Sequence, residues 1–188
     1  MADVQAPLIE TRALKKYFPV GDHSQLHAVD GINLKIYPGE TLGVVGESGC
    51  GKSTLGRTIL RLQEPTDGQI LYDGKDITKY NRRQMKQMRQ NMQLIFQDPY
   101  ASLDPRKSVV EIIAEYMIIN RTYPSKKEIY NYAAHLMDIV GLARRYANAY
   151  PHELDGGRRQ RIGIARALSL HPKFIVCDEP VSALDVSI

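Results

Sequence analysis

A glycine-rich stretch, Gly46 to Thr54, constrains this 188-residue chain more than any other feature. It reads GESGCGKST, which fits the pattern of a glycine, any four residues, and then Gly-Lys followed by Ser or Thr. Glycines let the backbone turn tightly and aim successive N–H groups at an anion. Lys52 adds a point charge for terminal phosphates, and Ser53 adds a hydroxyl suited to Mg²⁺. The stretch therefore predicts a phosphate loop that binds a nucleotide.

The residues on either side of the loop supply the context that the motif requires. The apolar run Thr41 to Val45 predicts a buried strand that leads into the loop, and Ser53 to Leu62 predicts a helix that leads out of it. The start of such a helix contributes N–H groups and the positive end of its dipole. We expect nucleotide contacts from all nine loop residues: Gly46, Glu47, Ser48, Gly49, Cys50, Gly51, Lys52, Ser53 and Thr54.

The composition is that of a soluble globular protein, with 43% hydrophobic and 24% charged residues. A formal charge of +4 permits an anionic ligand but does not favour nucleic acid as a partner. No apolar run approaches the roughly 20 residues that cross a bilayer, and residues 1–7 have no export signal. Cys50 and Cys177 are expected to be reduced thiols in a cytosolic protein, with Cys177 a small core residue.

Hydrophobic periodicity predicts an α/β core interrupted by a helical insertion. Strands are expected at 8–14, 32–36, 70–72, 94–96 and 173–177, and helices around 109–117, 129–140 and 158–170. Gly141 is a natural end for the second of these helices. The basic run Asn81 to Gln90 is interpreted as the solvated face of a further helix.

Polar groups follow two of the predicted strands. Asp178 ends the strand before it, where an acid can hold the coordination shell of Mg²⁺. Glu179 follows at once and points elsewhere, so it can act as general base on the attacking water. Gln97 ends another strand, and its neutral amide can touch both the metal and the water. The second half of a hydrolytic site is thus predicted from Gln97, Asp178 and Glu179.

At this point the chain resembles the ATP-binding subunit of an ABC transporter, and within that family the oligopeptide and dipeptide importers. The likeness covers essentially the whole chain, with its motifs in the family's order and spacing. It rests on the stretches 14–19, 96–106, 162–168 and 178–187, which read LKKYFP, FQDPYASLDPR, IGIARAL and DEPVSALDVS.

The resemblance implies roles residue by residue. Phe18 or Tyr17 would stack on adenine, and Gln97 would sense the terminal phosphate. Asp178 would support Mg²⁺, and Glu179 would polarise the water. Ser182 to Asp185 would touch the opposing subunit of a head-to-tail dimer, in which Asp155, Gly156 and Gly157 of one subunit close over ATP held by the other.

The implied fold is a RecA-like P-loop NTPase core, of the α/β class, with an N-terminal antiparallel β subdomain and an inserted α-helical subdomain. Residues 1–97 and 158–188 would form the core, and residues 98–157 the helical subdomain. The resemblance further implies two integral membrane permease subunits, an identical or homologous second ATPase, and indirectly an extracellular peptide-binding protein. The subunit would sit peripherally on the cytoplasmic face of the membrane.

Two features depart from the family pattern. The signature reads Leu154-Asp155-Gly156-Gly157-Arg158 where the family has Leu-Ser-Gly-Gly-Gln. A carboxylate replaces a hydroxyl that would donate a hydrogen bond to phosphate, although Arg158 brings a compensating cation. We therefore expect the ATP site that this signature completes to be weakened or inactive. The chain also stops at Ile188, before the histidine that the family carries after the next strand, and we expect a C-terminally truncated core.

The sequence leaves two other functions open. A nucleotide-binding regulatory module without turnover is favoured by Asp155 and disfavoured by Glu179. A soluble ABC ATPase working on DNA or ribosomes is disfavoured by the 97–106 stretch and by the modest positive charge.

Overall fold

The computed structural model describes residues 6–21, 24–98 and 102–179 of the chain. They divide into two compact units, residues 1–89 and 90–188. The expected boundaries of the core and helical subdomain, at 97/98 and 157/158, stay a prediction.

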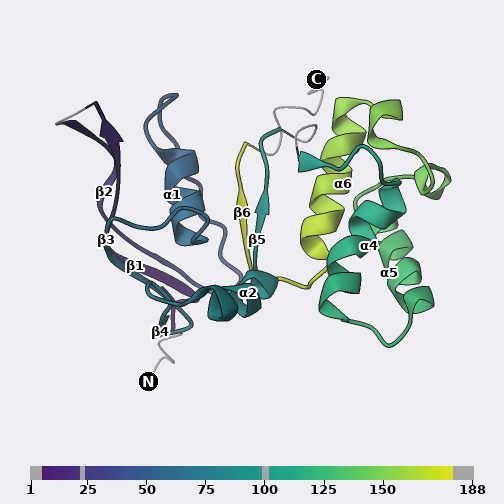
Figure 1. The fold of residues 1–188 in the computed structure, drawn as a ribbon, viewed down its shortest axis with the longest axis horizontal. Coiled ribbons are helices and arrows are strands. Elements are labelled where there is room, and N and C mark those ends of the chain that lie inside the picture. The colour runs from purple at the N-terminus through teal and green to yellow at the C-terminus, as the bar shows by residue number, and fades with distance from the viewer. Residues whose placement is uncertain (1–5, 22–23, 99–101, 180–188) are drawn as a thin grey trace. The chain divides into compact units, whose positions relative to one another are not determined.

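The first unit contains a four-stranded antiparallel sheet and a helix beside it (Figure 1). The strands are β1 (Ile9–Val20), β2 (Ser24–Ile36), β3 (Asp67–Tyr72) and β4 (Lys75–Asp76), in the spatial order β2-β1-β3-β4. The expected N-terminal antiparallel subdomain is therefore present. Strand β1 runs six residues further than the apolar pattern predicts, because residues 16–20 pair with the polar start of β2.

The segment before the phosphate loop differs from expectation. Residues 41–45 form no strand, and Leu42, Val44 and Val45 are 45%, 51% and 96% exposed. A strand is held by hydrogen bonds to a neighbour, and no described strand pairs with this segment. The prediction of a buried strand here is therefore wrong, because an apolar composition does not supply a pairing partner.

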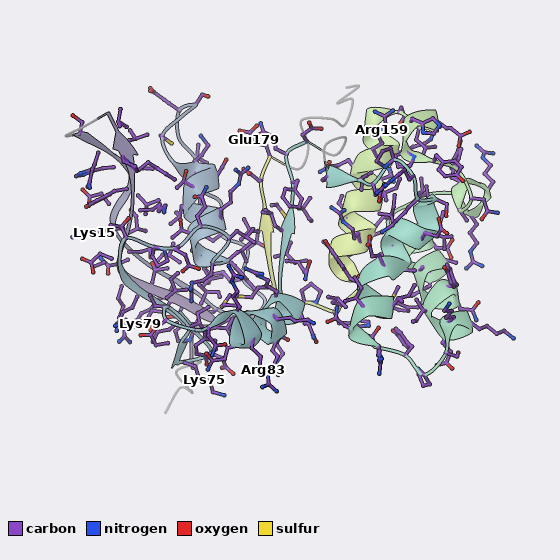
Figure 2. The ribbon with its side chains drawn as sticks, viewed as in Figure 1. Lys15, Lys75, Lys79, Arg83, Arg159 and Glu179 are labelled. Carbon is purple, nitrogen blue, oxygen red and sulfur yellow. The ribbon has the colours of Figure 1, made fainter. Side chains whose placement is uncertain are left out.

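Helix α1 (Lys52–Ile59) follows the loop; it begins one residue before the range 53–62 that the sequence predicts and ends three residues before that range does. Helix α2 (Arg82–Asn91) then leads out of the first unit. Its basic residues are exposed and only Met85 is buried, which confirms the solvated face. The labelled side chains of Lys75, Lys79 and Arg83 extend from β4, the following loop and the start of α2 (Figure 2).

The second unit combines a two-stranded parallel sheet with a helical bundle. Strands β5 (Met92–Ile95) and β6 (Phe174–Cys177) pair in parallel, from Met92 opposite Phe174 to Ile95 opposite Cys177. The bundle contains α4 (Val109–Asn120), α5 (Lys126–Ile139) and α6 (Gly156–Leu168), with short 3₁₀ turns η1 (Arg144–Tyr146) and η2 (Pro151–Glu153) between α5 and α6. Helix α5 ends just before Gly141, whose φ of 68° suits a glycine, as the sequence predicts.

The core of the second unit lies between these helices. The side chains predicted from helical spacing meet there, with Ile113, Met117, Ala133 and Met137 at 0% exposure. Leu142, Leu154 and Ile162 close the cluster from the turns and α6. Such burial stabilises by about 25 cal/mol per Å² of apolar surface, so this cluster holds the three helices together.

Cys177 corrects one expectation: it is exposed, at the end of β6, and is not a core residue. Strand β6 has a single described neighbour, β5, which leaves its end accessible. In the described part of the chain, no helix combines the length and apolar character needed to cross a bilayer.

Candidate functional site

The phosphate loop is an exposed turn whose path depends on glycine. Gly49 and Gly51 have φ angles of 81° and 96°, in the region that disfavours other residues. A Cβ on Gly51 would lie 2.1 Å from the carbonyl oxygen of Ala28 on β2, so no larger residue fits. The N–H of Cys50 donates to the carbonyl of Glu47 at 3.3 Å and closes the turn. Gly46 to Cys50 are exposed, and Gly51 to Thr54 are half-buried.

Lys52 is folded over this turn. Its ammonium donates to the carbonyls of Gly46 at 2.8 Å and Glu47 at 2.7 Å, and lies 3.7 Å from the sulfur of Cys50. No side chain in the described residues caps α1, which starts after Gly51. The first N–H groups of that helix and the Lys52 charge thus meet at one place, an arrangement that favours phosphate.

Tyr17 lies on β1 and is fixed by its neighbours. Its ring stacks on that of His27 with centroids 3.8 Å apart, and its hydroxyl donates to Asp30 at 2.5 Å. That hydrogen bond raises the pKa of Tyr17 to about 12 and lowers the pKa of Asp30. Phe18 next to it has the Lys16 ammonium 4.9 Å from its ring centroid. Both aromatic residues are half-buried, and Tyr17 is the more firmly held.

Gln97 and Glu179 come together in the second unit. The parallel pairing of β5 and β6 brings their carboxyl ends to one edge, where the Gln97 amide donates to the Glu179 carboxylate at 2.5 Å. Glu179, labelled in Figure 2 just beyond β6, has a φ of 46°. Asp178 is 7% exposed, and its N–H donates to the carbonyl of Ile95 at 3.0 Å. The sequence predicted all three as neighbours at strand ends, and the structure brings Gln97 and Glu179 into contact.

Asp155 forms the N-cap of α6. Its carboxylate accepts from the backbone N–H of Arg158 at 2.7 Å and pairs with the Arg158 guanidinium at 2.7 Å. The charge that was expected to repel phosphate is therefore held against its own helix and against a cation. Gly156 and Gly157 form the first turn of α6, and both are half-buried.

A cavity of about 670 Å³ opens at this end of α6. It is lined by Asp155 to Arg158 together with residues that the sequence did not suggest, namely Arg145, Tyr146 and Arg161. The guanidinium groups of Arg145 and Arg158 lie 5.0 and 4.9 Å from the Tyr146 ring centroid. The sequence Arg144-Arg145-Tyr146 precedes the signature, but its spacing gives no indication that these residues contact α6.

The structure thus groups the predicted site residues into separate clusters. The phosphate loop and Tyr17 with Phe18 lie in the first unit, whereas Gln97, Asp178 and Glu179, and the signature, lie in the second. The expectation that the acids lie alongside the phosphate loop stays a prediction. The contact loop Ser182 to Asp185 falls outside the described residues.

The sequence was compared with protein families and with known proteins. Residues 29–182 match the family model described as ABC transporter. The oligopeptide transport ATP-binding protein OppF of Bacillus subtilis is 52% identical over 96% of this chain and 59% of its own length. The dipeptide transport ATP-binding protein DppF of Escherichia coli is 45% identical over the whole chain and 57% of its own length. The chain thus spans a little under three fifths of these curated relatives.

Solved structures agree on the fold. The ATP-binding cassette MJ0796, in a dimeric post-hydrolysis state bound to ADP and Pi, superposes with a TM-score of 0.88 and 30% identity, covering 95% of this chain and 76% of the cassette. The expected P-loop NTPase fold with its antiparallel subdomain and inserted helices is confirmed by this likeness. The family model covers most of the sequence, the curated relatives share about half of its residues, and the chain belongs to the ABC transporter family.

Proposed function

We propose that this chain forms the ATP-binding and ATP-hydrolysing part of a subunit that powers an ABC importer for peptides. One observation carries the proposal: a phosphate loop with the Lys52 ammonium folded over it, before a helix start that no described side chain caps, occurs in the same chain as a paired Gln97 and Glu179 beyond two parallel strands. The names of the relatives, which are oligopeptide and dipeptide transport ATP-binding proteins, support peptides as the transported solute.

In this proposal the loop residues bind the triphosphate. Lys52 would exchange its carbonyl partners for oxygens of the β- and γ-phosphates, which are stronger acceptors because they are charged. The N–H groups of Gly49 to Thr54 would surround the same phosphates. Tyr17, held from behind by His27 and through its hydroxyl by Asp30, is the better supported platform for adenine, with Phe18 as the alternative.

The available side chains suit Mg²⁺ as a cofactor. This ion prefers oxygen ligands, and the Ser53 hydroxyl, the Asp178 carboxylate and the Gln97 amide oxygen supply them. The Gln97 amide nitrogen donates to Glu179, so in this proposal the amide oxygen is the atom that would reach the metal. When bound, the ion would neutralise charge on the terminal phosphates.

Glu179 is proposed as the general base. Its carboxylate is exposed, accepts a hydrogen bond from Gln97, and is therefore oriented and accessible to water. It would accept a proton from the water that attacks the γ-phosphorus, while Gln97 keeps it in position. Such a base contributes about 10²- to 10⁴-fold in rate.

The partners of the whole subunit belong to the same proposal. They are two membrane permeases, a second ATPase subunit, identical or homologous, and an extracellular peptide-binding protein, with the subunit peripheral at the cytoplasmic face of the membrane. Nucleic acid is not an expected partner.

Reconstitution of the intact protein with its permeases and binding protein in liposomes tests this proposal. ATP hydrolysis should rise when peptide-loaded binding protein is added, and labelled peptide should enter the liposomes. Co-purification with nucleic acid or ribosomes in place of permeases would contradict transport.

A second candidate is a subunit that binds ATP but turns it over slowly. Asp155 favours it, because a carboxylate stands where the family has a serine. The ion pair with Arg158 reduces the expected repulsion, and Glu179 provides a base, so hydrolysis remains the first proposal. Single-turnover measurements on the assembled transporter separate the two.

A further inference from the structure

A buried arginine stands just past the end of α1. The Arg61 side chain is 6% exposed, and its backbone has a φ of 51°. Glycine is the usual residue where a chain leaves a helix in this left-handed conformation. The backbone conformation alone would favour glycine at this position. The arginine is therefore explained by the contacts that its side chain makes.

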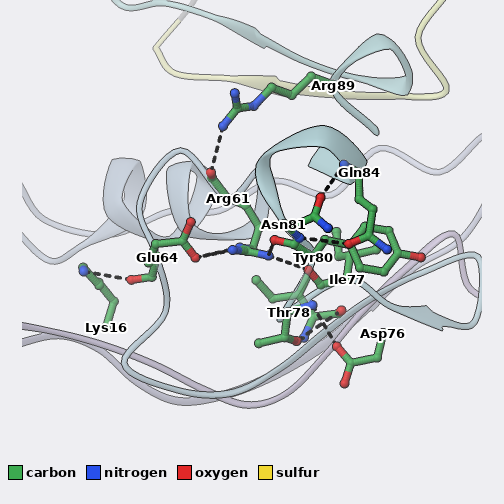
Figure 3. A network of polar contacts seen from close by, with 11 residues as sticks. Lys16, Arg61, Glu64, Asp76, Ile77, Thr78, Tyr80, Asn81, Gln84 and Arg89 are labelled. Carbon is green, nitrogen blue, oxygen red and sulfur yellow. Dashed lines mark hydrogen bonds and ion pairs between the residues drawn. The ribbon is translucent and has the colours of Figure 1, made fainter. Parts of the chain in front are cut away.

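The Arg61 guanidinium joins the end of α1 to the segment between β4 and α2. It donates to the carbonyl of Ile77 at 2.6 Å and to that of Tyr80 at 3.3 Å (Figure 3). It also pairs with the Glu64 carboxylate, with an Nε to Oε2 distance of 2.9 Å. Arg89 of α2 completes the link by donating to the carbonyl of Arg61 at 3.4 Å.

The turn after α1 is joined in the same way to β1. The Lys16 ammonium donates to the carbonyl of Glu64 at 2.8 Å, and the Thr66 N–H donates to the carbonyl of Lys15 at 2.8 Å. The Tyr17 N–H donates to the hydroxyl of Thr66 at 2.9 Å. Residues 61–66 thus connect α1, which begins with Lys52, to the backbone of the residue proposed to carry adenine.

We propose that Arg61 is a positioning residue for the nucleotide: its guanidinium fixes the 61–66 turn, and the turn sets the distance between the phosphate loop and Tyr17. Helix α1 has only eight residues, so a shift at its end moves its start. The inference rests on the proposed function, because it requires one nucleotide to touch both places. In this proposal Arg61 acts through the turn and does not contact the nucleotide.

Binding of two ligands to the intact protein tests this role. Inorganic tripolyphosphate with Mg²⁺ reports on the phosphate loop alone, and ATP with Mg²⁺ reports on the loop and Tyr17 together. Arg61→Gly keeps the left-handed backbone and removes the guanidinium. We expect ATP affinity to fall about five- to tenfold, the scale of one base-stacking contact, with tripolyphosphate affinity within about twofold. Arg61→Lys, which keeps one donor, should recover part of the loss.

Two further variants separate an effect on nucleotide positioning from a general loss of stability. Glu64→Gln removes the ion pair at an exposed carboxylate. It should also lower ATP affinity more than tripolyphosphate affinity, but by less than Arg61→Gly does. Thr11→Val breaks buried hydrogen bonds between β1 and β2, away from the turn, and should lower stability without separating the two ligands. Equal weakening of both ligands by Arg61→Gly, or no change in either, overturns the inference and leaves the proposed function standing. A wild-type protein that binds tripolyphosphate but gains nothing from the rest of ATP overturns the proposed adenine platform and this inference together.

Discussion

The starts of α1 and α6 are both glycine-rich helix N-termini, yet they are built differently. Helix α1 follows Gly51, with a φ of 96°, and no described side chain caps it. Helix α6 follows Asp155, whose carboxylate accepts from the Arg158 N–H and pairs with the Arg158 guanidinium. The first N–H groups of α1 are left for a ligand. At the start of α6, the Asp155 carboxylate already accepts one of these N–H groups and supplies a negative charge.

The difference shows how side-chain choice decides what a helix start can do. A carboxylate cap stabilises its helix by about 1 kcal/mol but supplies the negative charge that a bound phosphate would otherwise bring. An uncapped start gives up that stabilisation and keeps its N–H groups for phosphate. We therefore expect α1 to dominate nucleotide affinity and α6 to adjust turnover.

The largest effect is expected from Gly51→Ala. The new Cβ would lie 2.1 Å from the Ala28 carbonyl oxygen. The clash and the left-handed backbone together cost about 2–5 kcal/mol, so ATP affinity should fall about 100-fold or more. Gly163→Ala in α6 is the matched control: nothing lies within 4 Å of its Cβ, and it should stabilise the helix by about 0.5–1 kcal/mol. Titration calorimetry with ATP, together with thermal unfolding, measures both, and tight ATP binding by Gly51→Ala would refute the described loop.

Lys52→Met should have the next largest effect. It removes the ammonium that now bonds to Gly46 and Glu47, and a charged hydrogen bond is worth about 1.5–3 kcal/mol. ATP affinity should fall about 10- to 100-fold in a binding titration, with the secondary structure seen by circular dichroism unchanged. Lys107→Met, which breaks an ion pair with Glu115 in the second unit, should leave affinity unaltered.

The double substitution Asp155→Ser with Arg158→Gln should have a smaller and opposite effect. It restores the family's signature and removes the carboxylate from the start of α6. Steady-state hydrolysis by the assembled transporter should rise by about two- to tenfold, which corresponds to about 0.4–1.4 kcal/mol. Arg158→Gln alone leaves the carboxylate without its cation and should slow hydrolysis. An unchanged rate in the double variant would show that Asp155 has no bearing on turnover.

The smallest effect is expected from Asp30→Asn beside Tyr17. The Asp30 carboxylate raises the pKa of Tyr17 to about 12, so the amide should return that pKa toward the ordinary value of about 10. Because the folded-state pKa is raised, the stabilisation is present below about pH 10 and is lost as the pH rises through about 12. Carbon NMR of the tyrosine rings follows the titration. A Tyr17 pKa that is the same in Asp30→Asn as in the wild type would contradict the hydrogen bond between Tyr17 and Asp30.

Much of this molecule could be predicted from local pattern. The helical spacing of Ile113, Met117, Ala133 and Met137 identified the bundle core, because a 3.6-residue repeat fixes which faces meet. The spacing of the phosphate loop identified Lys52 and Ser53. Gln97 and Glu179 were identified because each follows the end of a short apolar run that predicts a strand.

The remainder depends on contacts that local pattern does not encode. Residues 41–45 have a strand's composition but no described partner. The pairing of Tyr17 with His27 follows from irregular register in β1, and the cluster of Arg145, Tyr146 and Arg158 depends on how the η1 turn returns to α6. The burial of Arg61 depends on carbonyl groups of residues 77 and 80, which its position in the sequence does not indicate.

The central proposal is that the phosphate loop and Glu179 act on the same ATP molecule. Glu179→Gln in the intact protein tests it most directly, because the amide keeps the size of the side chain and cannot accept a proton. We predict ATP affinity within about twofold of the wild-type value and single-turnover hydrolysis slower by about 10²- to 10⁴-fold. Hydrolysis at the wild-type rate would contradict the account.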